Sequence, residues 1–353
     1  MVSERASVSK TTVSRFLNGK FEYMSAETKD RIQSVIDELD YRPNTMAQSL
    51  KNNKSGLLGL VIDEIDNPIT SKFVKGVFEY FKKTGFQIIT IETDGTSIKN
   101  WELIKNLIDY RVEGFIVNSN RIDEQLINEL VNQEVDIVLA DMFGPNNFKN
   151  TVGSNYNFVV DEFLRMSEHL KVDRIFYFFD SSSSKVDYKK HKLLVEKFKI
   201  KNAEIEFIEM HKIKQLRKPH IALQKILEEQ IRVGFFFEDL ATGIPFLNEI
   251  FQVINIPLNN YMIFGYDPHG IYTKFSKNIG VFSHPSREIG TEAARLLHKI
   301  IEDEKKKLKP KRIKVQPKLT FPSIIDESEN NFDRLVRVIN EENEILDMNY
   351  TKR

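Results

Sequence analysis

Short apolar runs alternate with amphipathic stretches along most of the chain after residue 56. The runs have the pattern of buried strands, and the stretches between them repeat apolar residues at helical spacing. The amphipathic stretches include Phe73–Lys83, Ile122–Gln133 and Leu193–Lys199. The expected strands are Leu57–Ile62, Phe86–Ile91, Gly114–Val117, Val135–Ala140, Arg174–Phe179, Ala203–Ile208, Arg232–Phe237, Tyr261–Gly265, Asn278–Phe282 and Lys318–Phe321. This alternation favours an α/β fold of parallel sheets covered by helices on both faces. We expect two sheets of five or six strands rather than one of ten.

The first fifty residues have a different pattern, that of short helices around a small apolar core. One helix is expected from the N-cap Ser9 to the stop signal Asn18-Gly19, and a second from Ser25 to Asp40. Their apolar positions are Val13, Phe16, Leu17, Ile32, Val35, Ile36 and Leu39. The polar positions left on the outer face of the first helix are Lys10, Thr11, Thr12, Ser14 and Arg15. Long donors and hydroxyls there suit a helix in the major groove of DNA. An ordinary helical cap on a larger domain explains this pattern equally well.

Charge adds a local signal to an otherwise balanced chain. The 353 residues carry 51 basic and 51 acidic side chains, so the chain as a whole is neutral. Residues 1–20 hold Arg5, Lys10, Arg15 and Lys20 against Glu4 alone, which gives 4 − 1 = +3. Such a patch suits phosphate groups, and it is also found on ordinary solvated surfaces.

Several classes of protein are disfavoured by what the sequence lacks. There is no cysteine, hence no disulfide, thiol nucleophile or thiolate metal site. The longest apolar runs fall far short of the ~20 residues that span a bilayer, and no secretory signal pattern opens the chain, so we expect a cytoplasmic protein without membrane contact. Common enzyme motifs are missing, His211 and His220 have no third ligand at metal spacing, and Ser181–Ser184 has the character of a polar loop. We therefore expect no enzyme, no cofactor and no metal.

Four spaced motifs in a fixed order point to one family. They are Val-Ser-x-x-Thr-Val-Ser-Arg-x-Leu-Asn at 8–18, Tyr-x-Pro-Asn-x-x-Ala-x-Ser-Leu at 41–50, Ser-Gly-x-x-Gly at 55–59, and Asp66-Asn67-Pro68. With them the chain resembles the lactose-repressor (LacI/GalR) family of bacterial transcription regulators over roughly residues 1–325. The resemblance implies a small all-α helix-turn-helix headpiece and a two-subdomain core of the type I periplasmic-binding-protein-like fold with parallel sheets.

The resemblance also implies a division of the chain. Residues 1–43 would be the headpiece, 44–55 a hinge helix and linker, 56–325 the effector-binding and dimerisation core, and 326–353 a C-terminal extension. One core subdomain would comprise about 56–157 plus 287–316, and the other 158–286 plus 317–325.

The resemblance assigns DNA contacts to the headpiece and the hinge. Lys10, Thr11 and Arg15 would face base edges, and Thr12, Ser14 and Asn18 would lie nearer the phosphates. Asn44–Lys51, beginning with Asn44, would be a hinge helix that orders only on operator DNA. Leu50 would wedge into a minor-groove step, which costs a few kcal/mol of unstacking and kinks the duplex. A linker leucine packed on its neighbour is the alternative for Leu50.

The effector residues implied by the resemblance follow the expected strands. They are Ile69, Thr70, Asp141, Glu238 and Asp267, with Lys185 and Asp187 in a loop. Carboxylates at strand ends suit a polyol, because each oxygen accepts from adjacent hydroxyls; each could instead cap the following helix. Asp187 stands where sugar-binding members carry an arginine. Either Lys185 or Lys189 supplies the cation, or the effector is unusual.

Two further departures concern the ends of the chain. The family carries several residues before the position of Val2, so either the coding start is set too late or the first helix is short and weakly capped. A lost cap costs about 1 kcal/mol. Residues 326–353 place Phe332, Leu335, Val336 and Ile339 at roughly helical spacing. This segment could be an oligomerisation helix, a helix packed on its own subunit, or a frayed tail.

Together these features predict a homodimeric, sequence-specific regulator that binds double-stranded operator DNA and represses carbohydrate-use genes under a small sugar-like effector. Two alternatives remain. The regulator could respond to a protein partner, as the Asp187 departure and the basic segment Lys305–Lys318 permit, or the chain could be an intracellular sugar-binding domain with a non-functional headpiece.

Overall fold

A computed structural model describes the chain as two units, Met1–Gly56 and Leu57–Arg353. The described residues are 2–17, 19–22, 24–41, 55–93, 97–119, 122–142, 148–169, 171–179, 195–196, 205–209, 232–238, 240, 243, 261–266, 279–303 and 308–320.

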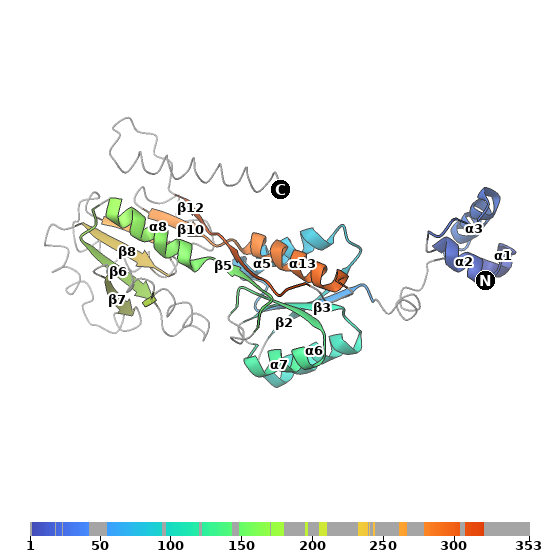
Figure 1. The fold of residues 1–353 in the computed structure, drawn as a ribbon, viewed down its shortest axis with the longest axis horizontal. Coiled ribbons are helices and arrows are strands. Elements are labelled where there is room, and N and C mark those ends of the chain that lie inside the picture. The colour runs from blue at the N-terminus through green and yellow to red at the C-terminus, as the bar shows by residue number, and fades with distance from the viewer. Residues whose placement is uncertain are drawn as a thin grey trace, which may run out of the picture. The chain divides into compact units, whose positions relative to one another are not determined.

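The N-terminal unit contains three short helices around one small core: α1 (Val2–Arg5), α2 (Lys10–Leu17) and α3 (Ala26–Glu38) (Figure 1). The expected caps are confirmed, because the Thr12 amide donates to Ser9 Oγ at 3.0 Å and the Thr28 amide to Ser25 Oγ at 3.2 Å. The buried residues that all three helices share are Val2, Ala6, Val13, Ile32 and Val35. Arg5 and Glu38 form an ion pair at 2.5 Å that links α1 to the end of α3.

The second unit is built on two six-stranded sheets. The first has the order β11-β5-β4-β3-β1-β2 and is parallel throughout. Its strands are β1 (Leu57–Ile62), β2 (Gln87–Glu92), β3 (Gly114–Asn118), β4 (Asp136–Ala140), β5 (Thr151–Ser154) and β11 (Arg312–Val315). The second has the order β12-β10-β9-β8-β6-β7, and only its edge strand β12 is antiparallel. Its strands are β6 (Arg174–Phe179), β7 (Ile205–Glu209), β8 (Val233–Phe237), β9 (Tyr261–Tyr266), β10 (Ile279–Ser283) and β12 (Lys318–Thr320).

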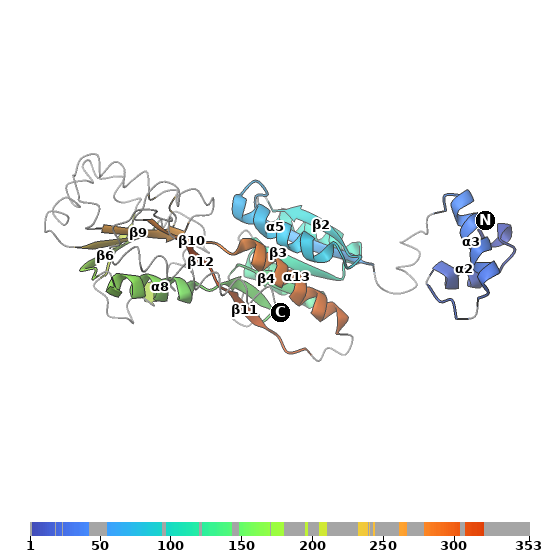
Figure 2. The ribbon, with the colours of Figure 1, turned by 90° about the horizontal axis from the view of Figure 1, so that it is seen from above.

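Helices cover both faces of the first sheet (Figure 1), and the two helices of one face are seen from above in Figure 2. On one face α5 (Pro68–Phe81) and α13 (Ser286–Glu302) pack side by side, and on the other lie α6 (Ser97–Asp109) and α7 (Glu124–Asn132). We call this sheet with its four helices the first lobe. The second sheet packs against α8 (Tyr156–His169) through an aromatic core that includes Phe163, Phe236 and Phe264, and we call it the second lobe.

The chain passes between the two lobes three times, always at carboxyl ends of strands. β5 ends at Ser154 just before α8, and β10 ends at Ser283 just before α13. β11 ends at Val315, and β12 then starts at Lys318, which pairs with Ser283. The Asn155 amide donates to the Val315 carbonyl at 2.8 Å, so two of the crossings touch. The carboxyl edges of the two sheets are therefore joined to each other.

The two-lobed α/β fold expected from the sequence is confirmed, and so are all ten expected strands within one or two residues. Two strands, β5 and β11, were not predicted. β5 is four residues long with a central glycine, and β11 alternates in a lysine-rich segment, which was interpreted as a linker. β5 lies between β4 and β11, and β11 pairs with β5 alone at the edge of the sheet. Among the helices that the structure describes, none has the length and apolarity to cross a membrane.

Two glycines allow α5 and α13 to approach closely. A Cβ on Gly76 of α5 would lie 2.0 Å from the Arg287 carbonyl oxygen, and one on Gly290 of α13 would lie 2.2 Å from the Phe73 carbonyl oxygen. Both contacts are to helix backbone, which cannot rotate aside as a side chain can. The first lobe thus depends on glycine at both positions.

We expect Gly290→Ala to lower the free energy of unfolding by about 1–3 kcal/mol, the usual cost of overpacking. Urea denaturation followed by circular dichroism measures this. Lys299→Ala, on the exposed side of the same helix, should change stability by no more than about 0.5 kcal/mol. Equal stability of Gly290→Ala and the parent chain would contradict the assigned role of the close contact.

Candidate functional sites

The outward face of α2 carries the predicted DNA-contacting side chains. Lys10, Thr11 and Arg15 are exposed, whereas Val13 is buried in the three-helix core. This division follows from the period of the helix, because burying Val13 turns the opposite positions outward. Thr12 and Ser14 are half-buried on the flanks, and the Thr12 hydroxyl lies 2.8 Å from Ser9 Oγ.

The chemistry of this face is that of hydrogen-bond donors. The first turn of α2 contains no acidic residue, and Arg15 lies in its last turn. An arginine fork can donate two parallel bonds to a guanine edge, and lysine and hydroxyl groups reach base edges or phosphates. The helix can therefore present both kinds of contact to a nucleic-acid groove.

A second cluster of polar residues closes the carboxyl edge of the first sheet. Three polar residues directly follow three neighbouring strands: Asp63 follows β1, Thr93 follows β2 and Ser119 follows β3. They lie on the face of the sheet that includes Val61 and Ile91. Asp63 Oδ1 accepts from Thr93 Oγ1 at 2.9 Å and from Ser119 Oγ at 2.5 Å. The two hydroxyls are fully buried, so the carboxylate is held in place by the ends of three strands.

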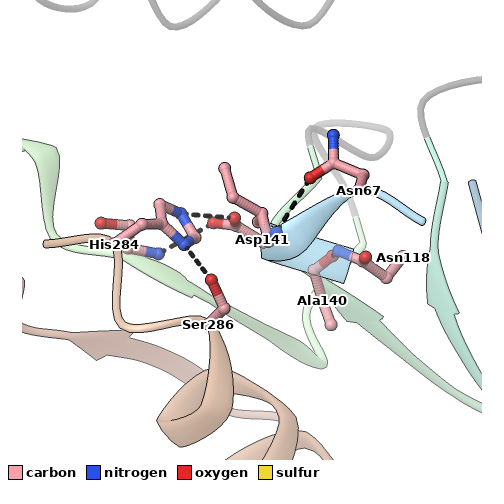
Figure 3. Close-up of polar contacts among 8 residues, drawn as sticks. Asn67, Asn118, Ala140, Asp141, His284 and Ser286 are labelled. Atoms are coloured by element: carbon pink, nitrogen blue, oxygen red, sulfur yellow. Dashed lines mark hydrogen bonds and ion pairs between the residues drawn. The ribbon is translucent and has the colours of Figure 1, made fainter. Parts of the chain in front are cut away.

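The predicted effector residues Ile69 and Thr70 begin α5 beside this edge. Asn67 caps the helix by accepting from the Ile69 amide at 2.9 Å, and Pro68 occupies the first turn. Thr70 is buried and Ile69 half-buried. On the neighbouring strand end, Asn118 Nδ2 donates to the Ala140 carbonyl at 2.8 Å. Figure 3 shows Asn67, Asn118 and Ala140 near Asp141.

Asp141 has a partner on each carboxylate oxygen. It follows β4 with a left-handed backbone (φ 50°), and its Oδ1 accepts from the Ser154 amide at 3.1 Å. Its Oδ2 lies 2.8 Å from His284 Nε2, and both side chains are nearly buried, with 13% and 9% of their surfaces exposed. A predicted site residue is thus fixed by two segments that cross between the lobes.

His284 was not singled out from the sequence. It lies between the end of β10 and the start of α13, and its Nδ1 contacts Ser286 Oγ at 2.7 Å (Figure 3). The sequence contained a signal that could have identified it, because a polar residue just after a parallel strand lies at the edge where ligands bind.

In the second lobe, Glu238 follows β8 and accepts a hydrogen bond from the Tyr177 hydroxyl. Tyr266, at the end of β9, has its ring 6.0 Å from that of Tyr156 and 6.4 Å from that of His284. Burial raises the pKa of both Tyr177 and Tyr266 well above the usual value, and the nearby Glu238 carboxylate raises both further. Both hydroxyls therefore stay protonated at a higher pH than an exposed tyrosine does.

The remaining predicted site residues lie outside the described residues: Asn18, Asn44, Leu50, Lys185, Asp187 and Asp267. So does the extension from residue 326 onward. Within the part of the chain that the structure describes, no group of three or more histidine, aspartate or glutamate side chains is arranged to hold a metal ion.

Comparison with known proteins identifies the N-terminal unit. Residues 2–44 match the family model of bacterial regulatory proteins, lacI family. Residues 2–44 therefore form a lacI-family domain. The resemblance inferred from the spaced motifs is thereby confirmed.

Curated transcriptional regulators are similar to this chain beyond the headpiece. It is 35% identical over 164 residues to the transcriptional regulator KdgR of Bacillus subtilis, an alignment that covers 46% of this chain and 48% of KdgR. It thus spans about half the length of that relative. It is 26% identical over 314 residues to the repressor PurR of Aliivibrio salmonicida, covering 86% of this chain and 92% of PurR.

Solved structures of transcriptional regulators share the fold over about 90% of this chain. A Lac repressor dimer bound to operator and the anti-inducer ONPF superposes with a TM-score of 0.68 at 17% identity, covering 90% of this chain and 96% of that one. The regulator CelR in complex with cellobiose gives a TM-score of 0.57 at 19% identity, with 91% and 97% covered.

The buried tyrosines predict a loss of stability in alkali. The unfolded chain releases a tyrosine proton near pH 10, whereas the folded chain retains it because the folded pKa is raised. The raised pKa of each buried tyrosine therefore contributes fully to the free energy of unfolding below about pH 10. As the pH rises from there toward the folded pKa, this contribution falls by up to about 1.4 kcal/mol per pH unit for each buried tyrosine.

We therefore expect Tyr266→Phe to lose less stability than the parent chain between about pH 9 and pH 11. Urea denaturation at the two pH values measures the difference. Tyr110→Phe serves as the control, because 60% of the Tyr110 side chain is already exposed in the folded chain. An equal pH slope for Tyr266→Phe and the parent would overturn the assignment.

Proposed function

We propose that this chain is a sequence-specific DNA-binding transcriptional regulator that represses carbohydrate-use genes. The observation that supports this most directly is the headpiece: a capped helix, α2, directs Lys10, Thr11 and Arg15 outward within a segment that matches the lacI-family model. In this proposal these three side chains contact base edges, and Thr12, Ser14 and Asn18 lie nearer the phosphates.

The segment after the headpiece completes the DNA-binding surface in this proposal. Asn44–Lys51 forms a hinge helix on operator DNA, and Leu50 enters a minor-groove step. The kink costs a few kcal/mol of unstacking and is offset by the contacts that it allows. Because a two-fold dimer presents two identical reading helices, the operator is a near-palindrome and the protein a homodimer.

The two-lobed core is the sensor for a small, sugar-like effector. Its carboxyl edges bring Asp141 and the start of α5 to the junction of the lobes, where ligands of open parallel sheets bind. Glu238 ends a strand of the opposite sheet. Lys185, Asp187 and Asp267 complete the proposed site. Effector binding alters the arrangement of the lobes, disfavours the hinge helix and lowers operator affinity, and operator in turn lowers effector affinity.

Arg15→Ala tests base reading. We expect it to weaken binding to operator by about 1–3 kcal/mol per half-site, which is roughly five- to 150-fold, and to relax base choice there. The operator is first selected from a randomised duplex pool with the parent chain, and affinities are then compared by fluorescence anisotropy against random duplex.

Arg31→Ala is the matched control, since Arg31 is exposed on α3 and the change removes the same charge. It should leave the ratio of specific to random affinity unchanged. If Arg15→Ala retains the parent ratio, α2 does not read bases.

Titration calorimetry of the full chain tests the effector site. A panel of neutral sugars, sugar acids and sugar phosphates should contain one class that binds saturably. Asp141→Asn should weaken that binding at least about tenfold, because a hydrogen bond to a charged group contributes about 1.5–3 kcal/mol. Glu168→Gln, exposed on α8, should not. Failure of every sugar to bind would favour control by a protein partner instead.

A further inference from the structure

The contact between Asp141 and His284 joins three parts of the core that are distant in sequence. Asp141 follows β4 in the first lobe, Ser154 is the last residue before the first crossing, and His284 lies in the second crossing. One carboxylate accepts from the Ser154 amide at 3.1 Å and lies 2.8 Å from His284 Nε2. The Asp141 carboxylate therefore connects the segment before the first crossing with the second crossing.

The imidazole is fixed on its other side as well. His284 Nδ1 lies 2.7 Å from the hydroxyl of Ser286, which is buried at the start of α13 (Figure 3). α13 in turn packs against α5 through Gly290 and Phe73. A displacement of His284 would therefore affect α13, and through α13 it would affect α5, whose first turn contains Ile69 and Thr70.

We propose that His284 is a positioning residue that holds Asp141 in the effector-free arrangement of the lobes, and that an effector hydroxyl replaces it. This inference rests on the proposed effector site. When a ligand hydroxyl donates a hydrogen bond to Asp141 Oδ2, it replaces His284 Nε2 as the partner of that oxygen. The second crossing is then released from β4, and the lobes adopt a different arrangement.

The exchange explains how a site with its carboxylate already partnered can still bind a ligand. A nearly buried carboxylate is costly to leave without a donor. In the arrangement described here His284 and the Ser154 amide supply the donors, and in the proposed complex the ligand supplies one of them. The two arrangements of the lobes therefore differ in which donor contacts Asp141 Oδ2. A ligand binds more tightly to the arrangement in which this oxygen is available to it, and so shifts the equilibrium toward that arrangement.

The absence of cysteine from the sequence allows a direct test on the full chain. Cysteines at Lys75 on α5 and Glu168 on α8, both exposed, carry one spin label in each lobe. Pulsed electron resonance then reports the distance between the lobes with no DNA or effector present. We expect His284→Leu to add or shift to a population at a different distance, whereas His284→Gln, whose amide can still donate to Asp141, should restore the parent distribution.

His298→Leu is the matched control. His298 is also on α13, with Nδ1 3.1 Å from the Tyr80 hydroxyl and Nε2 3.3 Å from Glu302, but its partners all belong to the first lobe. It should leave the distance distribution unchanged. Melting temperatures separate a shifted arrangement from a general loss of structure.

Identical distance distributions for the parent, His284→Leu and His284→Gln would overturn the proposal. If His284→Leu does not fold, Asp141→Asn and Ser286→Ala decide the question by the same measurement, and parent-like distances in both would refute it. Because this test contains neither operator nor sugar, its failure is distinguishable from failure of the proposed regulatory function, which the anisotropy and calorimetry experiments test separately.

Discussion

The direction of the strands constrains where chemistry can occur in this molecule. Eleven of the twelve described strands run parallel within their sheets, so each sheet gathers its strand ends at one edge. The three crossings join these two edges to each other. Polar side chains that would be scattered in an antiparallel protein are thereby brought together, and Asp63, Asp141, Glu238 and His284 all follow strand ends. The buried apolar faces of both lobes provide the rigid support for this polar junction.

The headpiece follows a simpler constraint. Its core is so small that Val13 is the one buried position in α2, and it determines which side chains face outward. Caps at Ser9 and Ser25 satisfy amides at the helix starts, as short helices require because they have few internal hydrogen bonds. The exposed side chains of α2, such as Lys10, Thr11 and Arg15, can therefore be selected for binding with little effect on the stability of the headpiece.

The sequence predicted the architecture well, because both helical and strand periodicity are strong here. The strands missed, β5 and β11, have little apolar content and are stabilised by pairing over a long sequence separation, which no local pattern reveals. The same limit applies to the candidate site. The position of Asp141 after a strand was visible, but its contact with His284 joins residues 143 positions apart in the chain. The sequence did not predict the cluster of Asp63, Thr93 and Ser119 either. Each is a single polar residue in the sequence, and the three come together only because β1, β2 and β3 are neighbours in the sheet.

The pairing of α5 with α13 has a consequence for the order of assembly. α5 ends at Phe81, whereas α13 does not begin until Ser286, and β11 completes the first sheet later still. During synthesis the emerging first lobe therefore lacks one helix and one edge strand until nearly the whole second lobe has left the ribosome. Its apolar face around Phe73 and Val77 stays uncovered over that interval. Segments made late in translation close the part of the core that was begun first, so a chain that terminates before Ser286 would leave that lobe incomplete.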